Sequence, residues 1–201
     1  FFLDEARAVT IDASNNVYVT GNSSGKYATI AYSGAGVPLW TNRYGIENTD
    51  SGAEAIAVDC CNVYVTGDYA TVAYLHSGVA LWTNRYDTMD ESFNQIKALA
   101  PDGRGNVYVT GGSTPNGSSA YLDWITIKYI SRPGLTISSK QPETAFHLSL
   151  SGRCDTTYRI ETSSNLVNWV TLTNFANSNV SMEFKDFDAT NLIRFYRAAS
   201  P

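Results

Sequence analysis

Hydrophobic and polar residues recur in short β-type runs along the first two-thirds of the chain. The hexamer NVYVTG occurs three times, at residues 16–21, 62–67 and 106–111, with offsets of 46 and 44 residues. Valine alternates with tyrosine and threonine in each copy, which places apolar or aromatic side chains on both faces of a strand. Strands of this kind form sheets that are covered on both sides. The pattern therefore predicts sheets that lie between neighbouring sheets.

The segments around each hexamer repeat as well. The hexamers are preceded by AVTID (8–12), AIAVD (55–59) and ALAPD (98–102), and they are followed by ATIAYS (28–33), ATVAYL (70–75) and ITIKYI (125–130). The segment LWTNRY follows in two copies only, at 39–44 and 81–86. Turn formers such as Gly103-Arg104-Gly105 separate the segments and favour tight hairpins. Each unit is therefore expected to hold four antiparallel strands, with the last strand missing from the third unit.

Four-stranded units with a period of about 40 to 50 residues are typical of β-propeller blades. The expected fold class is all-β, with a partial β-propeller of three four-stranded blades, the last incomplete, in residues 1–132. The repeats span about 6–52, 53–95 and 96–132. A closed ring needs about four to eight blades. Either upstream blades of a longer protein complete the ring, or several copies of this chain do so, most simply as a dimer with six blades.

Residues 6–129 resemble the bacterial secreted β-propeller repeat, whose blades share A-x-A-V-D, G-N-V-Y-V-T-G, Y-A-T-I-K-Y and L-W-x-x-R-Y. This resemblance implies an extracellular or cell-surface protein and a scaffold, without naming an activity. The second copy departs from the pattern, because Cys60-Cys61 stands where Gly-Asn or Ser-Asn is usual. Phe1 falls inside a repeat, so we expect the chain to be a processed product or part of something longer.

Residues 133–201 lack the repeat and are expected to form a small C-terminal β-sandwich. Its strands are predicted at 135–139, 145–150, 157–162, 169–172, 180–184 and 193–198. Phe146, Leu148 and Leu150 alternate with polar residues, which is the pattern of a half-buried strand. The segments 158–169 and 194–197 resemble a C-terminal module of large secreted bacterial proteins. Trp169 is interpreted as a core residue rather than a sugar-stacking platform.

Charge and hydropathy exclude two classes of partner. The net charge is −5, and no cluster of lysine or arginine is available to neutralise phosphates, so we expect no nucleic acid partner. No apolar run approaches the roughly 18 residues that a transmembrane helix needs, so we expect no membrane insertion.

Candidate chemistry is sparse. Asp12, Asp59 and Asp102 recur at the first turn of every unit, which favours a role as turn hydrogen-bond acceptors over catalysis. His76 and His147 lie in no known catalytic motif and are expected at the surface. We therefore expect no catalytic residue, no metal and no cofactor.

The cysteines leave several pairings open. Cys60 and Cys61 are candidates for a vicinal disulfide, one of them could instead bond to Cys154, or they are buried thiols. The loop 113–123, with Asn116, Tyr121 and Asp123, is a candidate ligand loop. Three asparagines fit the N-glycosylation pattern, namely Asn22, Asn116 and Asn179.

The sequence thus predicts a non-enzymatic extracellular β-propeller scaffold for structural or protein–protein contacts, which assembles with itself through its incomplete blade edges. The alternative is a carbohydrate-binding module of a larger secreted protein or enzyme, with a polysaccharide as its partner. A hydrolase or lyase ranks below both, because no set of acid, base and nucleophile can be named.

Overall fold

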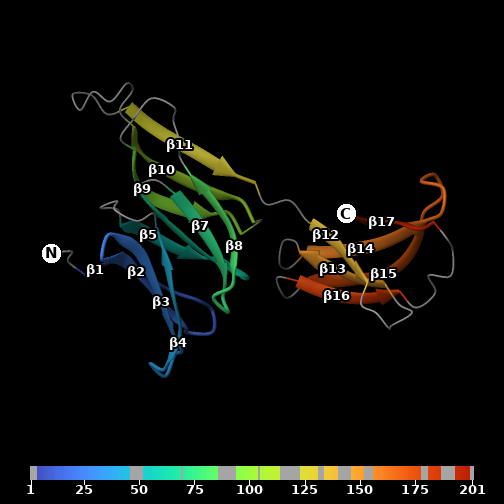
Figure 1. Ribbon diagram of the computed structural model, residues 1–201, viewed down its shortest axis with the longest axis horizontal. Coiled ribbons are helices and arrows are strands. Elements are labelled where there is room, and N and C mark those ends of the chain that lie inside the picture. Colours follow the sequence, from blue (N-terminus) through green and yellow to red (C-terminus); the bar gives the residue numbers. More distant parts are fainter. Residues whose placement is uncertain are drawn as a thin grey trace. The chain divides into compact units, whose positions relative to one another are not determined.

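The computed structural model divides the chain into two compact units, Phe1–Ile130 (unit 1) and Ser131–Pro201 (unit 2). The structure describes residues 4–45, 52–68, 70–85, 94–103, 105–113, 123–130, 134–139, 146–151, 156–177, 181–186 and 193–199. These residues form strands and turns in several antiparallel sheets (Figure 1), so the all-β fold class is confirmed. Within them there is no helix that could cross a membrane.

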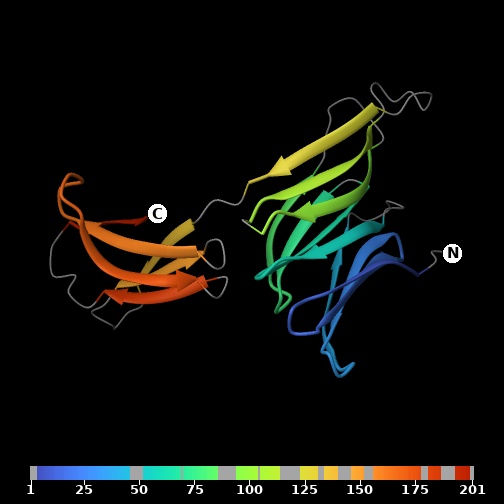
Figure 2. The ribbon, with the colours of Figure 1, turned by 180° about the vertical axis from the view of Figure 1, so that it is seen from behind.

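Unit 1 contains three antiparallel sheets, each formed by strands that are consecutive in the sequence. The first sheet has the order β1 (Glu5–Ile11), β2 (Val17–Ser23), β3 (Lys26–Tyr32), β4 (Pro38–Tyr44). The second has the order β5 (Ala53–Val58), β6 (Asn62–Gly67), β7 (Ala70–Leu75), β8 (Ala80–Arg85). The third has the order β9 (Asn94–Pro101), β10 (Val107–Ser113), β11 (Asp123–Tyr129), with β11 on its outer side (Figure 2).

Equivalent turns have the same backbone geometry. The β3–β4 and β7–β8 turns each place a glycine in the left-handed region, Gly36 at φ 79° and Gly78 at φ 88°. The amide of Gly36 donates to the carbonyl of Ser33 at 2.8 Å, and that of Gly78 donates to the carbonyl of Leu75 at 2.9 Å. Glycine adopts this conformation without the cost of a Cβ clash. The repeated glycines therefore set the same hairpin in both sheets.

Each sheet has two chemically different faces. We call the face that carries the tyrosine and threonine of NVYVTG the tyrosine face, and the face that carries its two valines the valine face. The strands β1, β5 and β9 are neighbours. Because β5 also contacts β2, and β9 also contacts β6, successive sheets pack face to face. Tyr18, Tyr27 and Ala31 of the first sheet pack against a buried cluster of the second sheet formed by Ile56, Val63, Val65, Ala70, Val72 and Tyr74.

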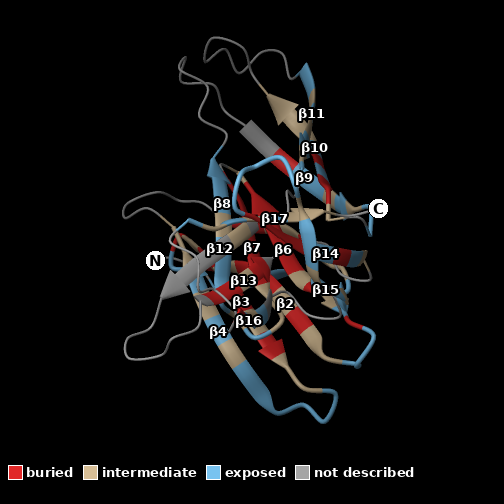
Figure 3. Cartoon of the chain, turned by 90° about the vertical axis from the view of Figure 1, so that its right-hand side faces the viewer, coloured by how far each residue is buried: buried red, intermediate tan, exposed pale blue. Residues whose placement is uncertain are grey.

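The second interface repeats the first. Tyr64 and Ala73 of the second sheet pack against Ile96, Val107 and Val109 of the third. The second sheet is therefore covered on both faces, as the sequence predicts, and its strands β6 and β7 are almost wholly buried (Figure 3). The prediction is wrong for the outer sheets. No described residue covers the valine face of the first sheet or the tyrosine face of the third, because each of these sheets has only one neighbouring sheet.

Unit 2 contains two three-stranded antiparallel sheets. One has the order β12 (Gly134–Ser139), β13 (Phe146–Ser151), β16 (Ser181–Asp186). The other has the order β15 (Val170–Asn177), β14 (Thr156–Ser163), β17 (Phe195–Ala199). Leu148 and Leu150 of β13 and Tyr158 and Ile160 of β14 are fully buried, so both sheets contribute alternate residues to the interior of this unit.

Candidate interaction surface

The repeated aspartates hold the first turn of each sheet. Oδ1 of Asp12 accepts hydrogen bonds from the amides of Ser14 and Asn16 at 2.8 and 2.9 Å. Its Oδ2 accepts from the side-chain amide of Asn16 and from the hydroxyl of Tyr18, both at 2.9 Å. Burial opposes ionisation of Asp12, but these hydrogen bonds outweigh it and lower the pKa of the carboxyl.

The same arrangement recurs in the other two sheets. Asp59 accepts from the amide of Asn62 at 2.8 Å and from the hydroxyl of Tyr64 at 2.8 Å. Asp102 accepts from the amide and the side-chain nitrogen of Asn106 at 3.1 and 2.6 Å. The predicted role of these aspartates as turn acceptors is therefore confirmed.

The prediction of a surface position is wrong for His147, which is buried, whereas the side chain of His76 is partly exposed, at 30%. His76 lies in the β7–β8 turn, where its Nε2 is 3.1 Å from the carbonyl of Asp59 and its Nδ1 is 3.7 Å from Oδ2 of Asp12. Its ring centroid is 5.7 Å from that of Tyr18. His76 is thus held between the first turns of two successive sheets, and His147 is buried in unit 2.

The tryptophan of LWTNRY joins one sheet to the next. Trp40 donates its indole N–H to the carbonyl of His76 at 2.8 Å, and its ring lies between Tyr18 and Tyr74 at centroid distances of 6.0 and 5.8 Å. Trp82 in the second sheet lies between Tyr64 and Tyr129 at 6.2 and 5.5 Å. Each tryptophan therefore contacts a tyrosine of its own sheet and one of the following sheet.

Ion pairs link the three adjacent first strands. Arg7 of β1, Glu54 of β5 and Lys97 of β9 stand at equivalent positions of the repeat. The guanidinium of Arg7 donates to Oε1 of Glu54, and Nζ of Lys97 lies 3.6 Å from Oε2 of the same carboxylate. Nearby, burial raises the pKa of Asp68. Glu5 supplies a second carboxylate, whose Oε2 lies 3.1 Å from Nε of Arg7, so two carboxylates balance the two cations. We therefore interpret this row as a structural link rather than a ligand site. Within the described residues, no group of three or more His, Cys, Asp or Glu side chains could hold a metal ion.

The tyrosine face of the third sheet is exposed, and we call it the open tyrosine face. Tyr108 is 37% exposed there, although the equivalent Tyr18 and Tyr64 are buried, and Trp124 is 97% exposed. This face also carries Thr110, Thr126 and Lys128. Hydroxyls of Thr110 and Thr126 lie 3.1 Å apart. The ammonium of Lys128 is 5.2 Å from the ring centroid of Tyr108.

The equivalent threonine pairs show what normally covers such a face. Thr20 and Thr29 in the first sheet are 3.1 Å apart, and Thr66 and Thr71 in the second are 2.9 Å apart. All four are buried beneath the following sheet. The third sheet thus presents an interface of the same construction without its covering sheet, which makes the open tyrosine face the main candidate interaction surface of unit 1.

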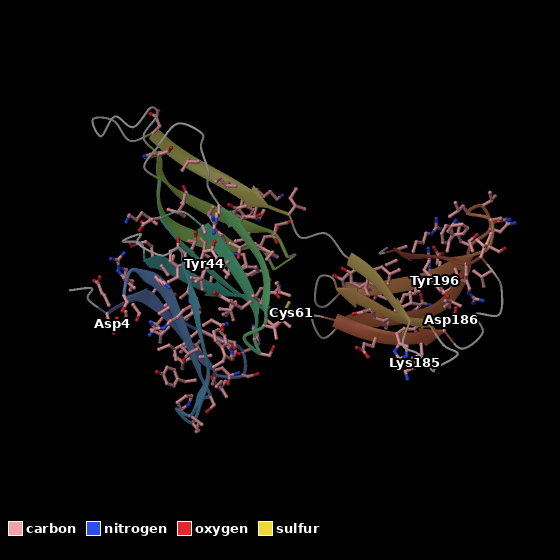
Figure 4. The ribbon with its side chains drawn as sticks, viewed as in Figure 1. Asp4, Tyr44, Cys61, Lys185, Asp186 and Tyr196 are labelled. Atoms are coloured by element: carbon pink, nitrogen blue, oxygen red, sulfur yellow. The ribbon has the colours of Figure 1, made fainter. Side chains whose placement is uncertain are left out.

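Polar contacts in unit 2 are internal. Asp186 is buried and accepts from Nε of Arg194 and from the hydroxyl of Tyr196, both at 2.9 Å (Figure 4). Burial and the neighbouring carboxylate of Asp186 raise the pKa of Tyr196 to about 12. The guanidinium of Arg197 lies 4.1 Å from the ring centroid of Trp169. Trp169 is half-buried, so its interpretation as a core residue is wrong, and the cation over its ring disfavours a role as an open stacking platform.

The predicted ligand and glycosylation residues fall partly outside the described residues. Asn116, Tyr121 and Asn179 lie there. Asp123 is exposed at the start of β11 and pairs with Ser113 in the ladder. Asn22 accepts from the amide of Gly25 at 2.9 Å and thereby holds the β2–β3 turn.

The structure removes one of the pairings that the sequence leaves open for the cysteines. Cys61 is a buried thiol, 4% exposed, whereas Cys60 is disulfide-bonded. The vicinal disulfide is therefore not formed, and the prediction of two buried thiols is wrong for Cys60. The alternative that involves Cys154 falls on a residue outside the described part of the chain.

Sequence reasoning missed the open tyrosine face, because the third hexamer is identical to the buried ones.

Comparisons with known proteins leave the family open. No family model matches the chain, and no curated protein matches it. Among solved structures, the chain is similar to the WD40 domain of Pan2 from Neurospora crassa, with 13% sequence identity and a TM-score of 0.42. The similarity covers 85% of this chain and 49% of that one. At this TM-score the similarity assigns neither a fold nor a function to the chain.

Proposed function

We propose that unit 1 is a segment of a β-propeller with three blades, the last incomplete, and that the chain is a non-enzymatic extracellular scaffold for protein contacts. The observation that carries this proposal is the repeated packing of a tyrosine face on a valine face, which ends in an open tyrosine face. An exposed aromatic surface of this construction fits a protein partner, because tyrosine and tryptophan are enriched in such interfaces.

The arrangement of the sheets supports the blades. In a propeller, four-stranded antiparallel sheets surround a central channel, so the first strands of successive blades are neighbours. The contacts of β1 with β5 and of β5 with β9 fit this arrangement, as does the ion-pair row of Arg7, Glu54 and Lys97. We further propose that unit 2 is a small β-sandwich, supported by the burial of Leu148 and Tyr158 from its two sheets.

The polar clusters support a non-enzymatic role. A catalytic carboxylate needs a free approach for a substrate, with a positioned acid, base or nucleophile beside it. The buried carboxylates Asp12 and Asp186 and the ion-paired Glu54 instead bond to neighbouring side chains that hold turns and strands together. The bacterial and extracellular parts of the proposal rest on the resemblance of the repeats alone.

The test compares binding of protein from the medium of the source cells to the immobilised chain and to two variants. Trp124→Ala truncates the open tyrosine face, whereas Val167→Ala truncates another exposed apolar residue, which is 77% exposed and lies in unit 2. We expect a bound protein that Trp124→Ala loses and Val167→Ala retains. Turnover of a panel of polysaccharides and esters by the pure chain would contradict the proposal.

A carbohydrate-binding module is the second candidate, and the exposed indole of Trp124 favours it. A planar aromatic ring with an apolar face and a polar N–H suits contact with a sugar ring. Retardation of the chain in gels that contain polysaccharide, abolished by Trp124→Ala, would favour this candidate over the protein scaffold. Unchanged migration in every polysaccharide would remove it.

A further inference from the structure

The valine face of the first sheet carries an unfilled hollow of about 280 Å³. Its lining includes Val19, Gly21, Ala28, Ile30, Thr41 and Arg43. The same face exposes apolar side chains, with Val9 64% and Ile11 59% exposed. In the second sheet, the equivalent residues are covered by the first sheet, so the chain itself shows what fills such a hollow.

Tyr27 of the first sheet fills the equivalent place in the second. It is 1% exposed, and its hydroxyl both donates to the carbonyl of Ala70 at 3.3 Å and accepts from the amide of Ala70 at 3.2 Å. A Cβ on Gly67 would lie 2.8 Å from the hydroxyl of Tyr27. Gly67 and Ala70 therefore form the site on the second sheet that receives an aromatic side chain. Their equivalents in the first sheet are Gly21 and Ala28.

Trp124 is the residue of the third sheet that corresponds to Tyr27. The segment DWITIKY (123–129) aligns with KYATIAY (26–32), and the bonded pairs Thr110–Thr126 and Thr20–Thr29 occupy equivalent positions. Trp124 is almost fully exposed, whereas Tyr27 is buried against Gly67 and Ala70. The same chain thus has an exposed aromatic side chain on its third sheet and, on its first sheet, an unfilled hollow of the kind that such a side chain occupies.

We propose that two copies of this chain associate, with the open tyrosine face of each copy on the valine face of the first sheet of the other, and with the indole of Trp124 in the hollow at Gly21 and Ala28. The proposal rests on the propeller arrangement proposed above, and it names a second copy of this chain as the protein partner of the open tyrosine face. Two such joints close a ring of six sheets around a two-fold axis. The occupant is a second copy, because both halves of the joint lie on the same chain and repeat the packing of a tyrosine face on a valine face seen in its two internal interfaces.

Two details of the joint follow from the internal interfaces. The indole N–H donates to the carbonyl of Ala28, as the hydroxyl of Tyr27 does to Ala70. Lys128 stands where Ala31 and Ala73 are buried, so its alkyl chain has to cover the ring of Tyr108 while its ammonium reaches the margin of the joint.

Sedimentation equilibrium of the full chain tests the proposal. We expect a dimer whose dissociation constant rises at least about tenfold for Trp124→Ala, because a buried tryptophan at an interface is a hot spot. Ala28→Leu fills the hollow and has the same expected effect, while Val167→Ala leaves the dissociation constant unchanged. Circular dichroism checks that each variant keeps its strands.

Mixing the two defective variants separates this joint from other modes of association. A pair formed by Trp124→Ala and Ala28→Leu keeps one intact joint, so the mixture is expected to dimerise more strongly than either variant alone. A chain that stays monomeric at its highest soluble concentration, or a dimer that neither substitution weakens, would overturn the proposal. A monomer without turnover leaves the scaffold function standing, whereas a dimer with turnover contradicts the scaffold function alone.

Discussion

Trp40 of the first sheet donates its indole N–H to the carbonyl of His76 in the second, at a distance of 2.8 Å. Two residues further along β4, the side-chain amide of Asn42 donates to the carbonyl of Gly78 at 2.6 Å. Both acceptors belong to the β7–β8 turn. The sheets are therefore joined by directional hydrogen bonds at their outer strands as well as by apolar packing, and this fixes how one sheet lies on the next.

Trp40→Phe is expected to lower the free energy of unfolding of unit 1 by about 1 kcal/mol, because it keeps an aromatic ring but leaves the carbonyl of His76 without its donor. Urea titration measures the change. Trp169→Phe is the matched control, because Trp169 donates to the carbonyl of Leu166 at an exposed site, and its expected cost is smaller. Equal costs for the two variants would count against the hydrogen bond from Trp40 to the carbonyl of His76 as a link between the two sheets.

Asp12→Asn is expected to destabilise the chain by about 1.5–3 kcal/mol at pH 7, since it weakens hydrogen bonds to a charged acceptor. The folded-state pKa of Asp12 lies below its unfolded value. Its ionisation therefore contributes stability that is complete above the unfolded pKa of about 3.9 and is lost as the pH falls through the folded value. Urea unfolding across that pH range should show that the difference in free energy of unfolding between the wild-type chain and Asp12→Asn shrinks towards acid pH.

The matched control for Asp12 is the same substitution at Asp102. Asp102 is exposed, so its hydrogen bonds compete with water. A smaller loss at pH 7 is expected for Asp102→Asn. A loss from Asp12→Asn that does not depend on pH would refute the role given to the ionised carboxylate.

Gly67→Ala is expected to be strongly destabilising. A Cβ at this position would lie 2.1 Å from the carbonyl oxygen of Gly52 and 2.8 Å from the hydroxyl of Tyr27, so backbone and an interface residue must move. Overpacking of this kind costs about 1–3 kcal/mol, and we expect the upper end. Gly36→Ala meets no atom within 4 Å and costs only the strain of its positive φ, about 1–2 kcal/mol. Thermal unfolding of both variants checks the order.

Glu54→Gln is expected to cost about 1 kcal/mol, since it removes the carboxylate that links Arg7 to Lys97 and leaves Arg7 paired with Glu5 alone. Lys97→Gln should cost less, because the Lys97 side chain is 54% exposed. Added salt should narrow the gap between the wild-type chain and Glu54→Gln, because it screens the repulsion between the two cations. A gap that widens with salt would argue against the ion-pair row.

The sequence repeat predicted the hairpins and the turn aspartates, because these depend on residues close together in the chain. Burial depends on a neighbouring sheet, and here the repeat misleads. The hexamer 106–111 is identical to 62–67, yet Tyr108 is exposed and Tyr64 is buried. Nothing within the hexamer records whether another sheet covers it.

His76 could not be placed by the repeat either. It aligns with Gly34 of the first unit, so no periodic signal marks it, and its contacts with Asp12 and Asp59 arise only when two sheets pack. Trp124 carried a signal that was overlooked. It aligns with Tyr27 in the repeat, and an aromatic residue retained at an interface position is evidence for a further interface.

The central claim is that successive sheets of unit 1 pack with a tyrosine face on a valine face. NMR spectroscopy tests it most directly at Tyr27 and Ala70, where the amide of Ala70 donates to the hydroxyl of Tyr27 at 3.2 Å. We predict a nuclear Overhauser contact between the Ala70 amide proton and the ring of Tyr27, together with slow exchange of that amide. Free exchange of the Ala70 amide without the contact, while the ladder between β6 and β7 stays protected, would mean that the sheets are separate ribbons.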